Sequence, residues 1–141
     1  MRKYWKRIVL TLCILLGLFW YILLQSNPDI VGQEHFLAKK NTLMAIKEQL
    51  KNIPIQPGKT ISARIKHVSL PKRVRDVHVI CDKQNRLFFV FYMGGGFLGN
   101  QGYIYAEHNI IGADISGLPD AESYIFTEVE KHWWSYDGKY D

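Results

Sequence analysis

Residues 76–93 read DVHVICDKQNRLFFVFYM, and this stretch decides the fold class. Apolar side chains recur at every second position from 77 to 81, which is the period of a β-strand. The polar run 82–86 predicts a turn, and the continuous apolar run 87–93 predicts a second strand in the centre of a sheet. Two strands joined by so short a turn are expected to be antiparallel neighbours.

The same period extends the sheet in both directions. Alternation over residues 60–66 predicts a strand before this hairpin. Downstream, residues 102–107 and 124–130 predict further strands, and residues 132–136 are a candidate for one more. The chain contains no internal repeat, so these strands belong to a single small sheet.

Residues 33–52, which precede the sheet, predict an amphipathic helix. Phe36, Leu43 and Leu50 are spaced by seven and form one apolar stripe, which Leu37 and Met44 widen. Prolines at 54 and 57 end the helix. Because the stripe covers too few heptads for a coiled coil, we expect it to pack on the sheet of the same domain. The sequence therefore predicts an α+β fold, with this helix on a mainly antiparallel sheet of about five strands.

The N-terminal run IVLTLCILLGLFWYILL, residues 8–24, contains 17 residues without a charge. As a helix it would extend roughly 25 Å, near the short end of what crosses a bilayer. Aromatic residues that favour headgroup regions flank the run: Tyr4 and Trp5 before it, Trp20 and Tyr21 near its end. The four cations Arg2, Lys3, Lys6 and Arg7 precede the run, and by the positive-inside rule they stay in the cytoplasm.

The sequence thus predicts a chain divided by a membrane. Residues 1–7 form a basic cytoplasmic tail, 8–24 a transmembrane helix, 25–32 a short stalk and 33–141 an α+β domain outside the cytoplasm. The inner (plasma) membrane is the expected location, with the C-terminal domain periplasmic or extracellular. A cleaved signal peptide is the alternative, but the run is long for one and no small-x-small site follows it.

Charge is unevenly distributed along the chain. The total is 18 Lys+Arg against 13 Asp+Glu, and four of the cations lie in the tail, so residues 25–141 are nearly neutral overall. This argues against a nucleic-acid-binding domain, which would carry a basic stripe on its folded part. Residues 25–90 hold 12 Lys+Arg and 5 Asp+Glu, whereas residues 91–141 hold 2 and 8. We expect strands from the two halves to pair and neutralise each other.

A glycine-rich segment, Gly94-Gly95-Gly96-Phe97-Leu98-Gly99, follows the central strand. It matches G-x-G-x-x-G in form, but a strand-like segment and not a helix comes next, so we expect neither a nucleotide nor another cofactor. Glycines permit positive φ and close backbone approach, and the segment predicts a hairpin loop with Phe97 and Leu98 at its tip. The loop is either a contact surface for a partner or a connector packed against the aromatic residues of the domain.

Aromatic residues gather in the C-terminal part, where Trp133 and Trp134 are adjacent and Tyr136 follows. On a strand only one of the two tryptophans faces the core, so the other, with Tyr136, is a candidate for protein contact or for resting in lipid headgroups. No histidine spacing predicts a metal site. Asp76 and His78 share a face of their strand, and with Glu107 they are the residues that a small hydrolase would use.

Three functions are compatible with these patterns. We favour a non-catalytic protein-binding module of the cell envelope, which contacts its partner through residues 94–99 and the C-terminal aromatics. Neutralising a toxin or supporting an envelope complex would both fit this module. A pilin-like structural subunit is the first alternative, since the order of elements resembles that of pilins in outline, although the glycine and acid of the pilin processing motif are missing. A small envelope hydrolase is the second.

Overall fold

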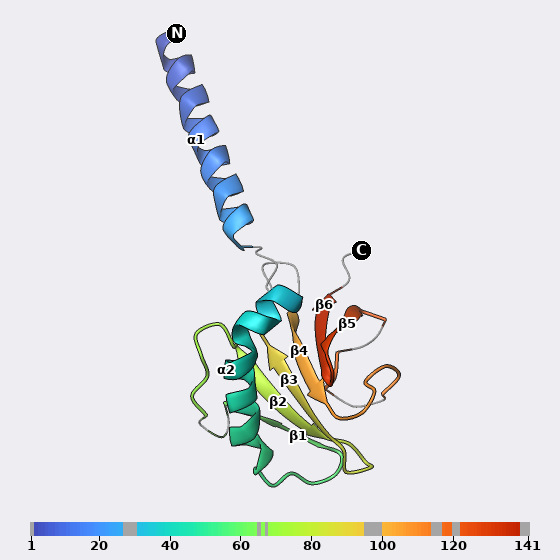
Figure 1. The fold of residues 1–141 in the computed structure, drawn as a ribbon. Helices are drawn as coiled ribbons and strands as arrows, with labels where there is room; N and C mark the ends of the chain where they lie inside the picture. Colours follow the sequence, from blue (N-terminus) through green and yellow to red (C-terminus); the bar gives the residue numbers. More distant parts are fainter. Residues whose placement is uncertain are drawn as a thin grey trace.

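The computed structural model of the 141-residue chain contains two helices and one six-stranded antiparallel sheet. It describes residues 2–26, 31–64, 66, 68–94, 100–113, 117–119 and 122–138, and within the first helix the side chains of residues 9–21. Helix α1 (Arg2–Ser26) extends away from the rest, and α2 (Gln33–Lys51) lies across one face of the sheet (Figure 1). The α+β class and the packing of the second helix on the sheet are confirmed.

Helix α2 forms where the heptad spacing predicts it and ends at Lys51, before the two prolines. Its buried residues Phe36, Leu43, Ile46 and Leu50 face the sheet. Leu37 is 57% exposed, so its predicted place in the apolar stripe is wrong. The position after Phe36 turns about 100° around the helix axis, which takes the side chain off the buried face.

The sheet has the order β1-β2-β3-β4-β6-β5, and each neighbouring pair is antiparallel. The strands are β1 (Lys59–Ser62), β2 (Asp76–Cys81), β3 (Leu87–Tyr92), β4 (Gln101–Ala106), β5 (Tyr124–Glu130) and β6 (Trp133–Gly138). The central position of β3 is confirmed. The expected five strands are six, because the last candidate segment, predicted at residues 132–136, largely coincides with strand β6, which is longer and covers Trp133–Gly138.

The strand order departs from the order in the chain at one place. Strand β6 pairs with β4, and β5 is the edge strand outside it. The connection from β4 to β5 therefore passes over the face of the sheet opposite α2. Ile110 and Leu118 of this connection pack on that face, and the hydroxyl of Tyr92 donates a hydrogen bond to the Gly117 carbonyl oxygen at 3.3 Å.

Alternation along the strands gives the sheet two apolar faces. One face packs against α2 and includes Val77, Phe89, Tyr103 and Trp133. A second buried cluster lies on the other face, and its members are Ile80, Phe88, Val90, Ile104, Ala106, Ile110 and Tyr136. Because β6 lies between β4 and β5, the connection from β4 to β5 crosses the second face and covers part of it.

The register defines two ends of the domain. Asp76 pairs with Tyr92, which pairs with Gly102, at the end of the sheet where α2 begins. There the Tyr103 hydroxyl donates to the Gly32 carbonyl oxygen at 3.2 Å. We call this the α1-proximal end. The β2–β3 turn, the last residue of β4 and the C-terminus of α2 lie at the opposite, α1-distal end (Figure 1).

Charges of the two halves of the chain do not neutralise each other by strand pairing, contrary to our expectation. The pair that joins the two halves is β3 with β4, and neither strand carries a charged residue. Lys40 of α2 forms an ion pair with Glu130 of β5 at 2.6 Å, which joins the two halves. Most basic residues in the described domain therefore lie on the α2 and β1–β2 side, and the β5–β6 side is mainly acidic.

The described side chains of α1 are all exposed, including Leu10 at 62%, Phe19 at 60% and Trp20 at 62%. Helix α1 continues to Ser26, into the predicted stalk. Judged on the described residues, to which α1 contributes the side chains of 9–21, no helix is long and apolar enough to cross a membrane.

Candidate functional site

The predicted glycine loop begins at the α1-proximal end. Gly94 follows β3 with a φ of 83°, and a Cβ there would overlap the Arg75 side chain. Gly95, Gly96, Phe97, Leu98 and Gly99 lie outside the described residues, so their proposed contact with a partner stays a prediction. Asn100, on the far side of the loop, is exposed and donates from its amide to the Tyr124 hydroxyl at 3.4 Å.

The three predicted contact aromatics of β6 lie on different faces. Trp133 is 2% exposed and packs under α2, with its ring centroid 5.1 Å from that of Phe36. Tyr136 points to the other face, is fully buried and donates its hydroxyl to the Phe91 carbonyl oxygen at 3.3 Å. Burial raises the pKa of Tyr136 well above its usual range, so its hydroxyl stays protonated. Of the three, Trp134 is the one that reaches the surface.

Asp76 and His78 lie together at the α1-proximal end, on the face of the sheet opposite α2. The Asp76 carboxylate accepts from the Ser62 hydroxyl at 2.9 Å and lies 3.1 Å from Nε2 of His78. The carboxylate stands between the serine and the histidine, so the histidine does not contact the hydroxyl that it would have to deprotonate. The arrangement joins β1 to β2.

Glu107 does not join this cluster. It follows β4 at the α1-distal end, whereas Asp76 begins β2 at the α1-proximal end. Measured along the strand direction, the positions of Asp76 and Glu107 differ by five residues, which corresponds to roughly 17 Å. Glu107 therefore does not converge with Asp76 and His78, and the geometry offers no support for a hydrolase that uses all three.

A cleft that the sequence did not predict lies at the α1-distal end, with a volume of about 270 Å³. It is bounded by the last turns of α2, by the β2–β3 turn and by the end of β4. Its lining residues are Lys47, Lys51, Asn85, Arg86, Leu87, Phe89, Tyr105, Glu107 and His108. Cationic and aromatic groups from α2, the β2–β3 turn, β3 and β4 thus meet in one concave surface.

Lys47 forms one wall of the cleft and is held in place on two sides. Its side chain is 9% exposed, and its Nζ lies 4.3 Å from the ring centroid of Tyr105, in cation–π geometry. The same Nζ lies 2.9 Å from Oε1 of Glu48. The hydrogen bond and charge of Lys47 lower the pKa of the exposed Glu48 carboxyl, so the acid is ionised at neutral pH.

Arg86 forms the opposite wall and is positioned by Asp82. The Asp82 carboxylate accepts from the backbone N–H of Gln84 at 2.9 Å, from that of Arg86 at 2.7 Å and from the Arg86 guanidinium. Burial alone would raise the pKa of Asp82, but the sum of these hydrogen bonds and the guanidinium charge lowers it. The turn therefore closes around an ionised carboxylate and fixes the direction of Arg86.

The lining of the cleft combines cationic, aromatic and apolar side chains with one carboxylate. Its lining residues include no serine, threonine or cysteine. Cys81, which lies behind the β2–β3 turn, is 1% exposed, and burial raises its thiol pKa, which leaves it inert. The described residues contain no group of three or more metal-ligating side chains. Aromatic and cationic groups of this kind suit contact with a polypeptide that carries acidic and apolar residues.

Sequence patterns could not have located this cleft. Lys47 and Lys51 share a helix face, and Arg86 lies in a turn, but their approach to Tyr105 depends on how α2 crosses the sheet. No protein-family model matches the chain, and neither a curated protein nor a solved structure matches it.

Proposed function

We propose that the protein is a single-pass membrane protein whose folded domain is a non-catalytic binding module outside the cytoplasm. The observation that carries the proposal is the separation of two surfaces. Apolar side chains surround α1 on every side and are exposed at one end of the molecule, and the cleft opens at the other. A helix that is apolar all round needs a nonpolar environment, either lipid or a protein interior.

Lipid is the environment that the flanking sequence favours. The uncharged run 8–24 lies within α1, and four cations precede it with no acid among them. These cations orient the helix with its N-terminus in the cytoplasm, since each is costly to move through a bilayer. Helix α1 then anchors the α1-proximal end of the domain, and the cleft faces the aqueous space beyond the membrane.

The proposed ligand of the cleft is a protein segment with acidic and apolar side chains. Lys51 and Arg86 supply charge, and Leu87, Phe89 and Tyr105 supply the apolar wall. Residues 94–99 and Trp134 stay a second proposed contact. A toxin-neutralising or a complex-supporting role would use either surface.

Topology and contact are tested separately. A reporter enzyme that is active only outside the cytoplasm, fused after Asp141, is expected to be active, and the fusion is expected to stay with the membrane fraction after alkaline extraction. Activity confined to a cytosolic reporter would overturn the placement.

For contact, a photo-cross-linking residue at Lys51 in the cleft is expected to give a discrete adduct in intact cells. The same residue at Lys59, exposed on β1, is the control and is expected to give none. An adduct from position 97 without one from position 51 would move the contact to the glycine loop. Adducts at none of these positions would contradict the binding role.

A further inference from the structure

The loop between β1 and β2 concentrates positive charge. Residues 64–75, called the basic loop below, contain five cations and no acid. The cations are Arg64, Lys66, Lys72, Arg73 and Arg75, and all are exposed. Lys39 of α2 adds a further positive charge beside them.

The basic loop is held against the domain by its apolar residues. Val74 is 7% exposed within the core under α2, and Val68 and Leu70 pack on the same core. Backbone bonds close the loop at both ends: Ala63 N–H donates to the Val77 carbonyl oxygen at 2.7 Å, and Arg75 N–H donates to that of Tyr92 at 2.7 Å. Val68, Leu70 and Val74 are turned inward, while the five cations of the loop are exposed.

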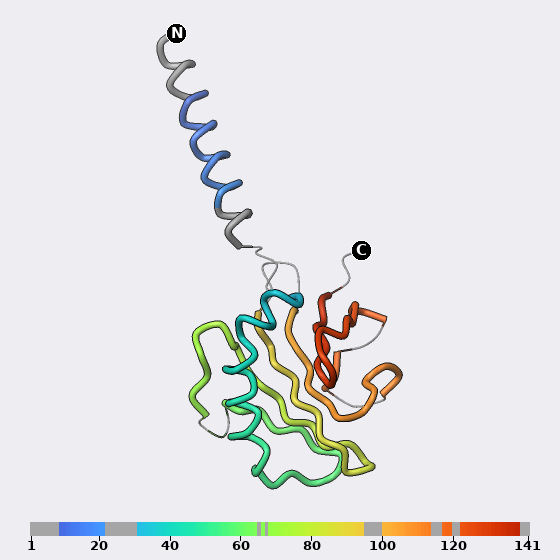
Figure 2. The backbone as a smooth tube through the Cα atoms, in the orientation of Figure 1, coloured from blue at the N-terminus to red at the C-terminus, as the bar shows by residue number. Residues whose placement is uncertain are grey.

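The register places the basic loop at the α1-proximal end. Ala63 and Arg75, at its two ends, bond to Val77 and Tyr92, which lie at that end of the sheet. The loop runs beside α2 (Figure 2). The positive charges of Lys39 and Arg73 help to lower the pKa of His35, in the first turn of α2, after the larger effect of burial. Arg73 therefore lies close to the point where the chain leaves for α1.

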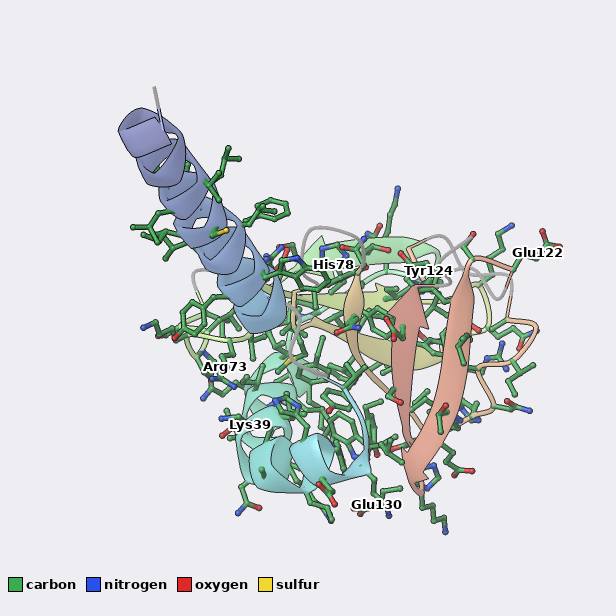
Figure 3. All side chains as sticks on the ribbon, turned by 90° about the horizontal axis from the view of Figure 1, so that it is seen from above. Lys39, Arg73, His78, Glu122, Tyr124 and Glu130 are labelled. Carbon is green, nitrogen blue, oxygen red and sulfur yellow. The ribbon has the colours of Figure 1, made fainter. Side chains whose placement is uncertain are left out.

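Three of the cations in the basic loop lack an acidic partner in the part of the chain that the structure describes. Among the described residues no carboxylate lies within ion-pair distance of Lys66, Lys72 or Arg73. The nearest acid along the chain, Asp76, is occupied by Ser62 and His78. In the view from the α1 end, Lys39 and Arg73 lie on one side and Glu122 on the opposite side (Figure 3).

We propose that the basic loop lies against the headgroups of anionic phospholipids at the surface of the membrane that holds α1. The proposal rests on the proposed membrane anchor. Residues 27–32 connect α1 to α2, and six residues reach at most about 21 Å even when fully extended. The loop is therefore tethered near the bilayer surface, where each cation adds to its attraction for anionic lipid. Headgroup contact would fix the rotation of the domain and hold the cleft away from the membrane.

The experiment uses the full chain in lipid nanodiscs. A fluorophore is attached through Ser69→Cys, an exposed position of the basic loop, in a Cys13→Ala background, while Cys81 stays buried. Quenching by a nitroxide on the lipid headgroup reports how often the loop touches the surface. We expect strong quenching in discs of phosphatidylcholine mixed with phosphatidylglycerol, weak quenching in phosphatidylcholine alone, and loss of the difference at high salt.

Two variants with the same change in charge separate local contact from net charge. Lys66→Gln/Lys72→Gln/Arg73→Gln is expected to lower the ratio of surface-bound to free loop on the order of 100-fold in the anionic discs. Lys59→Gln/Lys83→Gln/Lys131→Gln removes three exposed cations elsewhere and is expected to leave quenching unchanged.

Flotation of the chain with the discs distinguishes failure of the anchor from failure of the loop. A chain that floats with neither lipid mixture overturns both proposals. A chain that floats with both but shows quenching independent of lipid charge overturns the lipid contact alone. Quenching that changes with protein concentration and depends on the acidic residues of a second copy of the chain would also overturn the lipid contact. It would indicate contact between two domains instead.

Discussion

Gly102 occupies a position in β4 where no larger residue fits. A Cβ there would overlap the Phe91 carbonyl oxygen and would lie 2.6 Å from the Tyr136 hydroxyl oxygen. Tyr136 is its cross-strand partner, and the tyrosine ring fills the space that a side chain at 102 would take. The glycine at this position is therefore explained by close packing within the domain.

Gly102→Ala is expected to lower the free energy of unfolding by about 1–3 kcal/mol, because the strand must move to admit the methyl group. Urea unfolding of the full chain in detergent, followed by tryptophan fluorescence, measures the change. Gly17→Ala in α1 is the matched control, since nothing lies within 4 Å of its added Cβ. Equal unfolding midpoints for both variants would show that β4 and β6 are further apart than described.

His35 links the start of α2 to the sheet. The Tyr103 hydroxyl donates to the Gly32 carbonyl oxygen, so it accepts a hydrogen bond from Nδ1–H of His35 at 2.9 Å. Nε2 of His35 is buried without a partner among the described residues. Burial, and then the charges of Lys39 and Arg73, lower the pKa of His35. Burial also raises the pKa of Tyr103 to about 12, so its hydroxyl keeps its proton.

The lowered pKa of His35 predicts that the folded protein loses stability as the pH falls. The unfolded chain binds a proton at His35 near its ordinary pKa of 6.5, whereas the folded chain binds it at lower pH. The stability that neutral His35 contributes is therefore complete above pH 6.5 and falls as the pH drops below that value. Melting temperatures across this range measure the slope. His35→Asn, whose amide can replace Nδ1–H, is expected to show a smaller slope, and an unchanged slope would assign the effect to other groups.

At the scale of the element, α2 presents two leucines in opposite environments. Leu43 is fully buried against the sheet, and Leu37 is 57% exposed. The helix itself is capped without a side-chain hydrogen bond at its N-terminus, so packing of its buried face supplies much of its stability.

Leu43→Ala is expected to cost about 2–5 kcal/mol of unfolding free energy, through lost burial and the cavity left behind. Leu37→Ala, the same substitution on the same helix, is expected to change it by less than about 0.5 kcal/mol. Chemical denaturation monitored by circular dichroism measures both. A large effect at Leu37 would point to a covering surface, such as lipid or a partner, in place of water.

Strand β5 shows how the edge of the sheet is protected. It is the outer strand of the β4-β6-β5 part, and its register with β6 shifts between Glu128 and Glu130. A bulge and exposed acids are features that discourage pairing of an edge strand with another chain. Ile125, 57% exposed, is the apolar exception on this edge.

At the scale of the whole molecule, the fold turns a division of charge along the chain into a division in space. Most cations of the domain lie on the α2 and β1–β2 side and the β5–β6 side is mainly acidic, while α1 and the cleft occupy opposite ends. Such a domain carries a dipole, which can orient it at a charged surface.

The prediction at the scale of the whole molecule concerns the orientation of the chain in the membrane. Replacing Arg2, Lys3, Lys6 and Arg7 with glutamine removes the charges proposed to hold the N-terminus in the cytoplasm, and the activity of an external reporter fused after Asp141 is expected to fall. Replacing four cations of the domain, Lys51, Lys59, Lys83 and Lys131, is the control and is expected to leave reporter activity unchanged. Equal activity of both variants would contradict the proposed basis of orientation.

Local pattern was enough to predict most elements but not their arrangement. The strands β2 and β3, their turn, and the buried face of α2 follow from a spacing of two or seven, because neighbouring residues set that spacing. Leu37 was misplaced because the apolar stripe was drawn too wide from sequence alone. The exposure of Trp134 and the burial of Tyr136, two residues on the same face of β6, depend on what covers each position.

The amino-acid sequence by itself determined the α+β class, the apolar N-terminal helix, the helix 33–51 and the central hairpin, since these depend on contacts between residues close in the chain. Only the tertiary structure decided that β6 pairs with β4, that Asp76 lies far from Glu107, and that Lys47 and Arg86 border one cleft with Tyr105. Those relations join residues distant in the chain, and packing of the whole sheet against α2 is what brings them together.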